Sequence, residues 1–382
     1  MTQKIYSSFV YLLSFAFFEP AFAQATEMEF IREQYLRPGV HIKTWSFEEE
    51  SGFERFTEIA FPITYSLPVS RRLSLDVVTS PFLSTLSPIS GSGESLNNLT
   101  DTYIRTSYIL GDNLALLNCG VGIPSGKTNL DNKELSIAGI AANRPLDNPV
   151  SNLGAGLNLN FGLAVAQKIG SWVLGLGAGY AFKGEYTALL DTSEITVDPG
   201  NELNLSFGID RDFELENGKA KLIADIVFTN YLRDQYSALR SVPLIFEAGD
   251  KIVAQVRFLY PLGIFKPISF SIQNRWRLDN KSTNAALIDN GNELELSLAL
   301  FHPLSDKFRF KYVLDSKIYS NTVDDAEGAF VFGVGLGGIY KISDYFTFDP
   351  TVKFSKGKIN TGPGTDIGIT GFEFSGGLAI TF

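Results

Sequence analysis

Apolar and polar residues alternate along most of this chain with a period of two, the spacing of a β-strand whose two faces differ. The last stretch, 371–382, is the clearest case, and its apolar face consists of Phe372, Phe374, Gly376, Leu378, Ile380 and Phe382. Its other face is polar or small throughout. A stretch of this length, about twelve residues, can cross a tilted bilayer as one strand.

The same alternation recurs about sixteen times, which predicts an all-β chain. The two earliest strands, 40–45 and 56–65, are the least regular, because Pro62 cannot donate to a ladder; if they fail, the alternative is about fourteen strands. The remaining strands are expected at 73–79, 102–109, 114–123, 157–165, 172–182, 203–209, 222–228, 252–260, 268–278, 294–300, 308–318, 330–340, 346–354 and 371–382.

Connections between these strands alternate between short and long. The short ones are 67–72, 111–113, 168–171, 302–307 and 341–345, and the long ones are 80–99, 124–152, 184–201, 231–250, 279–291 and 356–368. Outer-membrane barrels show this asymmetry, with short periplasmic turns and long extracellular loops. Because every backbone group in hydrocarbon needs an internal partner, the sheet must close. We therefore expect a closed antiparallel transmembrane β-barrel in the outer membrane of a Gram-negative bacterium.

The N-terminus predicts export. Lys4, an apolar core at 10–18 and the motif Ala21-Phe22-Ala23 fit a signal peptide over 1–23. A short periplasmic segment, 24–39, would follow, and the barrel would occupy 40–382. Ser375, Gly377, Ile380 and Phe382 resemble the C-terminal signal that the barrel assembly machinery reads, so that machinery and outer-membrane lipid are the expected partners.

Composition narrows the function classes. Mean hydropathy is only +0.07 and no apolar run after the signal is long enough for a helical span, which excludes a helical membrane protein. A net charge of −10 argues against nucleic acid as a partner. The single cysteine, Cys119, forbids an intramolecular disulfide and falls on the apolar side of its strand. No cofactor and no metal site are expected.

Charged residues fall almost wholly on the face opposite the apolar one, as a barrel lumen requires, because a charge facing lipid at mid-depth costs about 2–4 kcal/mol. One interpretation is a wall of mutually neutralised charges that stiffens the barrel. The other is a set of ladders that select or orient a solute. The candidate lumen residues are Asp101, Arg105, Arg257, Arg275, Arg277, Glu293, Glu295, Arg309, Lys311 and Glu373.

Candidate catalytic chemistry is sparse. The only histidines are His41, on the uncertain first strand, and His302, in a predicted periplasmic turn. Neither is accompanied by a nucleophile elbow or by metal-ligand spacing, so we expect no enzyme. The stretch 122–128 has three residues rather than four between its glycines, which favours a turn over a phosphate-binding loop.

The segment 124–152 interrupts the strand pattern and contains an apolar patch at 135–140. Two interpretations stay open: insertion into the lumen, or packing against other extracellular loops. Glycines on predicted inward faces, such as Gly175, Gly177 and Gly179, leave room for an inserted loop or for a solute path.

Leu99, Asp101, Arg105 and Tyr108, followed by Gly120, Pro124, Gly126 and Lys127, form the pattern L-x-D-x-x-x-R-x-x-Y … G-x-x-x-P-x-G-K. This pattern resembles that of the phenol-degradation (meta-pathway) transporter-like outer-membrane family, and more distantly the fatty-acid transporter barrels. The resemblance covers mainly residues 60–130, and Ser125 stands where the family has Thr.

The resemblance implies a channel for small, often hydrophobic or aromatic, molecules, with Asp101 and Arg105 in the lumen. The alternatives are a structural or adhesive barrel that displays its loops, and a membrane-embedded hydrolase.

Overall fold

The structure is a computed structural model that describes residues 34–48, 51–111, 115–190, 193–216, 218–238, 244–263, 265–282, 291–320, 328–360 and 366–382. The predicted signal peptide and residues 24–33 of the predicted periplasmic segment lie outside this part of the chain. The first strand begins at Tyr35, ahead of the predicted barrel boundary at 40.

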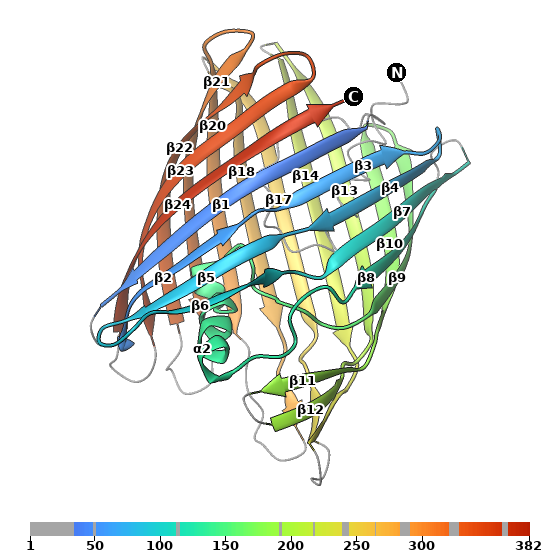
Figure 1. Cartoon of the computed structure of the whole chain (residues 1–382). Coiled ribbons are helices and arrows are strands. Elements are labelled where there is room, and N and C mark those ends of the chain that lie inside the picture. The colour runs from blue at the N-terminus through green and yellow to red at the C-terminus, as the bar shows by residue number, and fades with distance from the viewer. Residues whose placement is uncertain are drawn as a thin grey trace.

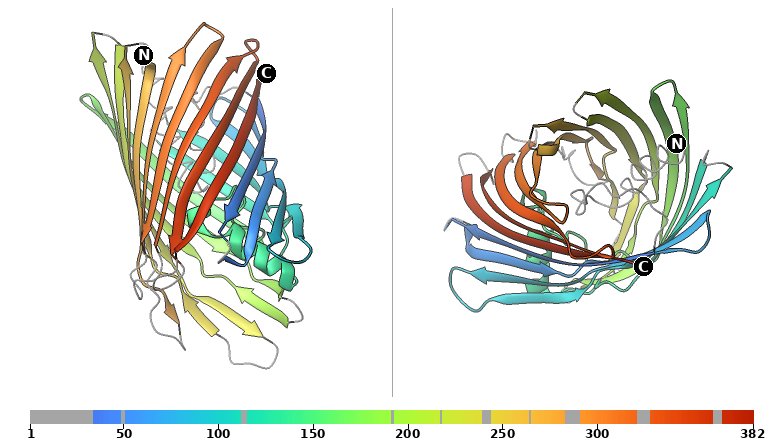
Figure 2. Two further views of the ribbon diagram at one scale, coloured as in Figure 1. Left: turned by 90° about the vertical axis from the view of Figure 1, so that its left-hand side faces the viewer. Right: turned by 90° about the horizontal axis from the view of Figure 1, so that it is seen from above.

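The chain forms a closed antiparallel barrel of sixteen strands, as the larger of the two predicted counts requires (Figure 1). Thirteen of the sixteen strand positions around the barrel are occupied by one continuous strand each: β1 (Tyr35–Phe47), β8 (Ala115–Ile123), β9 (Asn158–Ile169), β10 (Trp172–Lys183), β13 (Glu202–Leu215), β14 (Gly218–Tyr231), β17 (Lys251–Leu262), β18 (Phe265–Arg277), β20 (Asn292–Pro303), β21 (Phe308–Ser320), β22 (Gly328–Lys341), β23 (Phe346–Asn360) and β24 (Asp366–Thr381). Figure 2 shows the ring of strands from above.

Each of the other three strand positions is occupied by two shorter strands in line. They are β2 (Phe53–Ala60) with β3 (Ile63–Pro68), β4 (Leu73–Thr79) with β5 (Pro81–Pro88), and β6 (Glu94–Leu99) with β7 (Thr102–Leu110). Pro62 lies in the first of these breaks, where it donates nothing and its carbonyl accepts from Gly39 N at 2.8 Å.

The C-terminal strand closes the barrel. β24 pairs with β1 from Tyr35 opposite Thr381 to Phe47 opposite Ile369. Closure leaves no ladder edge in the wall, which is what a sheet in hydrocarbon needs. The predicted role of 371–382 as the closing strand is therefore confirmed.

The outer surface is apolar. Leu176 on β10, Leu336 on β22 and Phe354 on β23 are all exposed, and they belong to the faces predicted to touch lipid. Cys119 is likewise exposed on the outer face of β8. A contiguous apolar exterior of this kind is stable only in a bilayer.

The two ends of the barrel differ. The turns at the end that holds both described termini are short, such as 304–307 between β20 and β21 and 342–345 between β22 and β23. The opposite, extracellular end carries the long hairpins. None of the helices in the described part of the chain is both long enough and apolar enough to cross a membrane.

One long connection is not a loop. Residues 80–99 form a hairpin, β5 and β6, that extends the wall, with Phe56 to Ala60 pairing with Phe82 to Leu86. The expectation of a loop at 80–99 was wrong.

Three other long connections carry a second, five-stranded sheet at the extracellular end, made of β11 (Tyr186–Leu190), β12 (Ser193–Asp198), β15 (Asp234–Ala238), β16 (Leu244–Glu247) and β19 (Lys281–Ser282). Side chains bridge the joints between the two sheets: Asp234 accepts from Gly200 N at 2.6 Å, and Asn280 accepts from Gly249 N at 2.8 Å. These hydrogen bonds hold the connections through which the chain passes between the barrel wall and this sheet.

Candidate functional site: the plugged lumen

Residues 126–157, here called the plug, leave β8 and fold back between the extracellular ends of the strands. The plug contains the helix α2 (Asn132–Ala141) and the 3-10 turn η2 (Arg144–Leu146). Asp131 caps α2 by accepting from Glu134 N at 2.8 Å, while the Glu134 carboxylate accepts from Asp131 N at 3.2 Å. The sequence therefore starts this helix at a defined residue.

An apolar seat holds the plug against the wall. Ile137 of α2 and Leu146 of η2 are fully buried, each contributing roughly 1.5–3 kcal/mol by leaving water. They belong to one cluster with the buried wall residues Trp45, Phe56, Phe82, Leu86, Leu96, Val331 and Ile369. Of the two interpretations of 124–152, insertion into the lumen is the one that the structure shows, with the apolar residues of the segment packed against the inner wall.

Asp101 ties both ends of the plug together. Its Oδ1 accepts from Gly126 N and its Oδ2 from Ala155 N, both at 2.8 Å. Gly126 has to be glycine, because a Cβ there would lie 1.9 Å from the carbonyl oxygen of Leu153. Asp101 is buried, so this predicted lumen residue holds the plug's two ends.

Two more wall side chains bind the plug backbone. Trp45 Nε1 donates to the carbonyl oxygen of Leu146 at 3.0 Å. The fully buried Glu58 accepts from Val150 N at 2.7 Å and from Ser84 Oγ at 3.0 Å.

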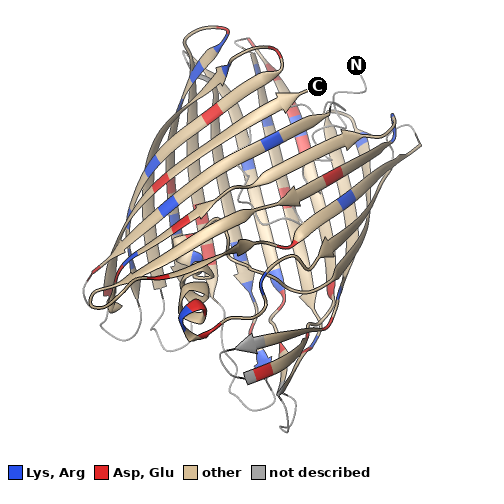
Figure 3. Ribbon diagram, viewed as in Figure 1, with Lys and Arg blue, Asp and Glu red and all other residues tan. Residues whose placement is uncertain are grey.

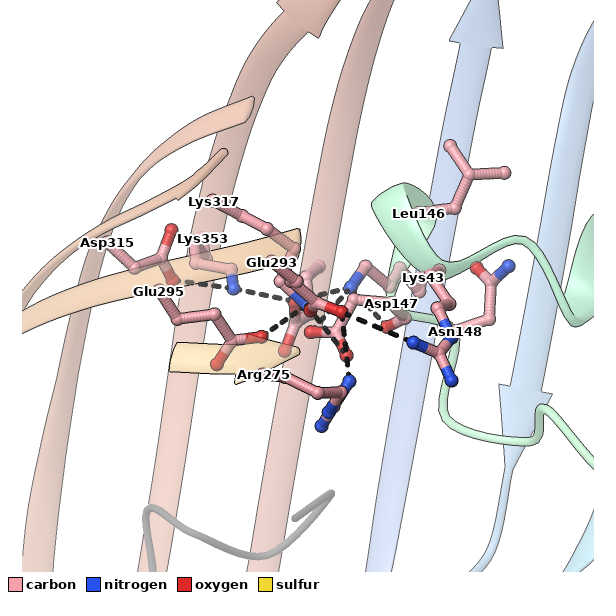
Figure 4. A network of polar contacts seen from close by, with 12 residues as sticks. Lys43, Leu146, Asp147, Asn148, Arg275, Glu293, Glu295, Asp315, Lys317 and Lys353 are labelled. Atoms are coloured by element: carbon pink, nitrogen blue, oxygen red, sulfur yellow. Dashed lines mark hydrogen bonds and ion pairs between the residues drawn. The ribbon is translucent and has the colours of Figure 1, made fainter. Parts of the chain in front are cut away.

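Beside η2 the plug meets a network of ion pairs (Figure 4). Lys43 Nζ donates to the backbone oxygen of Asp147 at 2.6 Å and lies 3.7 Å from its carboxylate, while Lys317 Nζ lies 3.6 Å from the other carboxylate oxygen. The two lysines are nearly buried in the wall, whereas the Asp147 side chain is largely exposed, so these ion pairs join the wall to a part of the plug that water reaches.

Wall carboxylates complete the network. Glu373 lies 3.5 Å from Lys43 and 3.1 Å from Lys353. Lys353 also pairs with Asp315 at 2.9 Å. Glu293 pairs with Arg275 at 2.9 Å and with Lys317 at 3.1 Å, and Glu295 pairs with Lys317 at 2.5 Å.

Asp147 is the plug's contribution to this network. It is the sole described residue other than glycine with a positive φ, at 49°, a conformation that costs a non-glycine residue roughly 1–2 kcal/mol. Its carboxylate is 64% exposed to the lumen although the wall surrounds it. Burial in the barrel raises the pKa of Asp147, but the charges of Lys317 and Lys43 outweigh it and hold this pKa below its ordinary value.

The structure brings together four of the candidate lumen residues, Arg275, Glu293, Glu295 and Glu373. Asp315 and Lys353, which the same inward strand phase predicts, also belong to this network. Arg105 lies elsewhere on the wall and binds Asp76 through Nη2 at 2.7 Å. Lys311 contacts Asp349 at 3.4 Å and Thr351 at 3.2 Å.

The last three predicted lumen residues are spread along the wall. Arg257 lies opposite Ile223 and Ser271. Arg309 is exposed near the periplasmic end. Arg277 stands at the extracellular rim beside Lys251. Figure 3 shows how the charges distribute over the strands.

Four residues of the network were missed from the sequence: Lys43, Arg144, Asp147 and Lys317. Lys317 shares the strand phase of Asp315 and Lys311, so the alternation could have found it. Asp147 and Arg144 lie in a segment without any period, so no pattern in the sequence places them.

The C-terminal residues occupy the two faces as predicted. Ser375 and Gly377 share the phase of lumen-facing Glu373, while Ile380 shares that of Phe372. Phe382 N donates to Gln34 O at 3.0 Å, and its side chain is exposed. Their role in assembly stays a prediction.

No family model matches the chain, and neither does any curated protein. Solved structures with a similar course of the chain include a monoaromatic hydrocarbon channel, CymD, with 13% identity, a TM-score of 0.43, and 97% of this chain and 92% of that chain covered. OccK7 (OpdD) of Pseudomonas aeruginosa has 10% identity and a TM-score of 0.46, with 92% and 99% covered. An anion-selective porin from Comamonas acidovorans has 12% identity and a TM-score of 0.41, with 91% and 98% covered.

The closed barrel with its apolar exterior decides the class of protein. The chain is a bacterial outer-membrane β-barrel. Its surroundings are therefore outer-membrane lipid, as predicted. The similarity to the solved structures concerns the course of the chain and does not identify a solute.

Proposed function

We propose that this barrel is a channel for the passive or facilitated passage of small molecules across the outer membrane, and that the plug controls its conductance. The observation that carries the proposal is the way the plug is held: by Asp101 at both ends and by ion pairs at Asp147. Ion pairs at a site open to water contribute little and exchange readily, so they suit an attachment that opens.

Solute movement needs no cofactor, because the solute gradient drives it. The resemblance around residues 99–127 supports small hydrophobic or aromatic molecules as the solute class. Liposome uptake with sugars, fatty acids and aromatic acids compares these classes directly.

Planar-bilayer conductance tests the channel. Residues 128–152 can be replaced by a short Gly-Ser linker, because the plug ends meet at Gly126 and Gly154. We expect small or rare openings from the full chain and larger, steadier ones from the excised variant. If neither protein opens, the channel proposal fails.

A second candidate function is recognition at the cell surface, which the displayed five-stranded sheet favours. If this protein binds other cells through that sheet, replacing residues 186–198 by a short turn should abolish the binding to cells and leave the conductance unchanged. Loss of conductance alone would instead favour the channel.

We also propose that the protein is not an enzyme. His41 lies opposite Ser375 and Ala60 on the neighbouring strands. An ester-hydrolysis assay with the full chain and His41→Ala tests this: activity that disappears in the variant would overturn the proposal.

A further inference from the structure

Two like charges stand side by side at the extracellular rim of the lumen. Lys251 opens β17 and Arg277 closes β18, and the two residues are direct partners across the strands. Their neighbours in the same row are Thr229 on β14 and, beyond Arg277, Gly291. Like charges directly opposite destabilise a sheet, and this row supplies no acid to offset them.

Both cations are held against one aromatic ring. Arg277 Cζ lies 5.3 Å and Lys251 Nζ 5.8 Å from the centroid of Tyr231. Among the described residues no carboxylate lies within ion-pair distance of either cation, and Arg277 Nε is buried without a hydrogen-bond partner. Glu293, in the next row, is already shared by Arg275 and Lys317.

The plug adds a third cation. Arg144 of η2 lies 4.0 Å from Glu293, so it reaches the wall where β18 and β20 meet. Its pKa lies below the ordinary value because of burial and because of the neighbouring charges of Arg277 and Arg275. Cations from the wall and from the plug therefore converge on one place without an equal number of acids.

We propose that Lys251, Arg277 and Arg144 form a binding site at the extracellular mouth for the carboxylate or phosphate group of a small solute. A guanidinium presents a planar fork that fits either oxyanion through two hydrogen bonds, and a lysine adds a point charge. The inference rests on the proposed function in one respect, because the bound anion is taken to be a solute on its way into the lumen.

Calorimetric titration of the full chain in detergent tests the site, with benzoate and inorganic phosphate as separate probes. We expect saturable binding of at least one probe, weakened at least about tenfold in Lys251→Gln/Arg277→Gln. The better probe assigns the oxyanion. The matched control is Lys307→Gln/Lys341→Gln, which removes two exposed neighbouring cations at the periplasmic end and should bind as the unaltered chain does.

Equal binding in Lys251→Gln/Arg277→Gln and in the unaltered chain would overturn the inference, as would no binding of either probe. Should the double variant fail to fold, Arg277→Lys keeps the charge, loses the fork and should still bind several-fold more weakly. Conductance in potassium chloride separates the two proposals. If binding is lost in Lys251→Gln/Arg277→Gln but the unaltered chain shows no conductance, the binding site is supported and the channel proposal is contradicted. If the unaltered chain conducts but the double variant binds the probe equally well, the channel proposal is supported and the binding site is contradicted.

Discussion

The indole Nε1 of Trp45 donates a 3.0 Å hydrogen bond to the carbonyl oxygen of Leu146, and both side chains are buried. The first strand of the barrel thereby sets the position of the plug. The last strand sets the position of the indole, because a Cβ at Gly371 would lie 2.6 Å from the Trp45 ring. The seam that closes the barrel and the seat of the plug are therefore one structure.

Gly371→Ala should displace the indole and loosen the plug while leaving the ladder of β24 intact. We expect a higher open probability in planar bilayers, because the Trp45–Leu146 hydrogen bond and part of the apolar seat are lost. The control is Gly377→Ala on the same face of the same strand, where a Cβ meets nothing within 4 Å. Equal behaviour of the two variants would mean that the indole does not set the plug.

Asp147→Asn should weaken the plug's hold on the lumen. The amide keeps the size of the side chain but loses the attraction to Lys43 and Lys317, on the order of 1 kcal/mol at a site open to water. Several-fold more frequent openings are expected, against no change in Asp306→Asn at the exposed periplasmic turn. Fewer openings in Asp147→Asn would contradict this role for the carboxylate.

The same carboxylate gives the plug a pH dependence. Its pKa is lowered in the folded chain, so its contribution is complete above the ordinary aspartate value of about 4 and is lost as the pH falls through the lower, folded value. Open probability should stay level from neutral pH to about 5 and rise only in strong acid. In Asp147→Asn the part of the rise that belongs to this group should be missing, and a rise near neutral pH would point to another group.

The sequence predicts the barrel well because most strands keep a lipid face and a polar lumen face. It fails where the plug covers the wall. There Phe82, Leu86 and Leu96 face inward yet are apolar, so the alternation disappears and 80–99 was interpreted as a loop. The ion-pair network was not predicted for a related reason, because Asp147 belongs to a segment whose position is set by tertiary contacts alone.

Lys353 should matter more for stability than any exposed lysine. It lies within 3.1 Å of Glu373 and 2.9 Å of Asp315, and Lys353→Gln leaves both carboxylates short of a charge partner. We expect a loss of about 3–5 kcal/mol in the free energy of unfolding, measured by urea denaturation in detergent. Lys358→Gln on the same strand, an exposed lysine 3.5 Å from Asp366, should change it by under about 0.5 kcal/mol. Similar losses of unfolding free energy in Lys353→Gln and Lys358→Gln would show that the network does not stabilise the barrel.

Asp101 offers a graded test of how the plug is tied down. The carboxylate accepts from Gly126 N and Ala155 N at once; Asp101→Asn keeps one acceptor, and Asp101→Ala keeps none. Because each buried N–H left unpaired costs about 1–3 kcal/mol, cleavage of the plug by added protease should rise in the order Asp, Asn, Ala. The barrel should remain folded by its resistance to unfolding in SDS without heating, since neither N–H belongs to a wall ladder. Cleavage equal in all three would show that the apolar seat alone retains the plug, and unfolding of the barrel itself would show that Asp101 supports the wall.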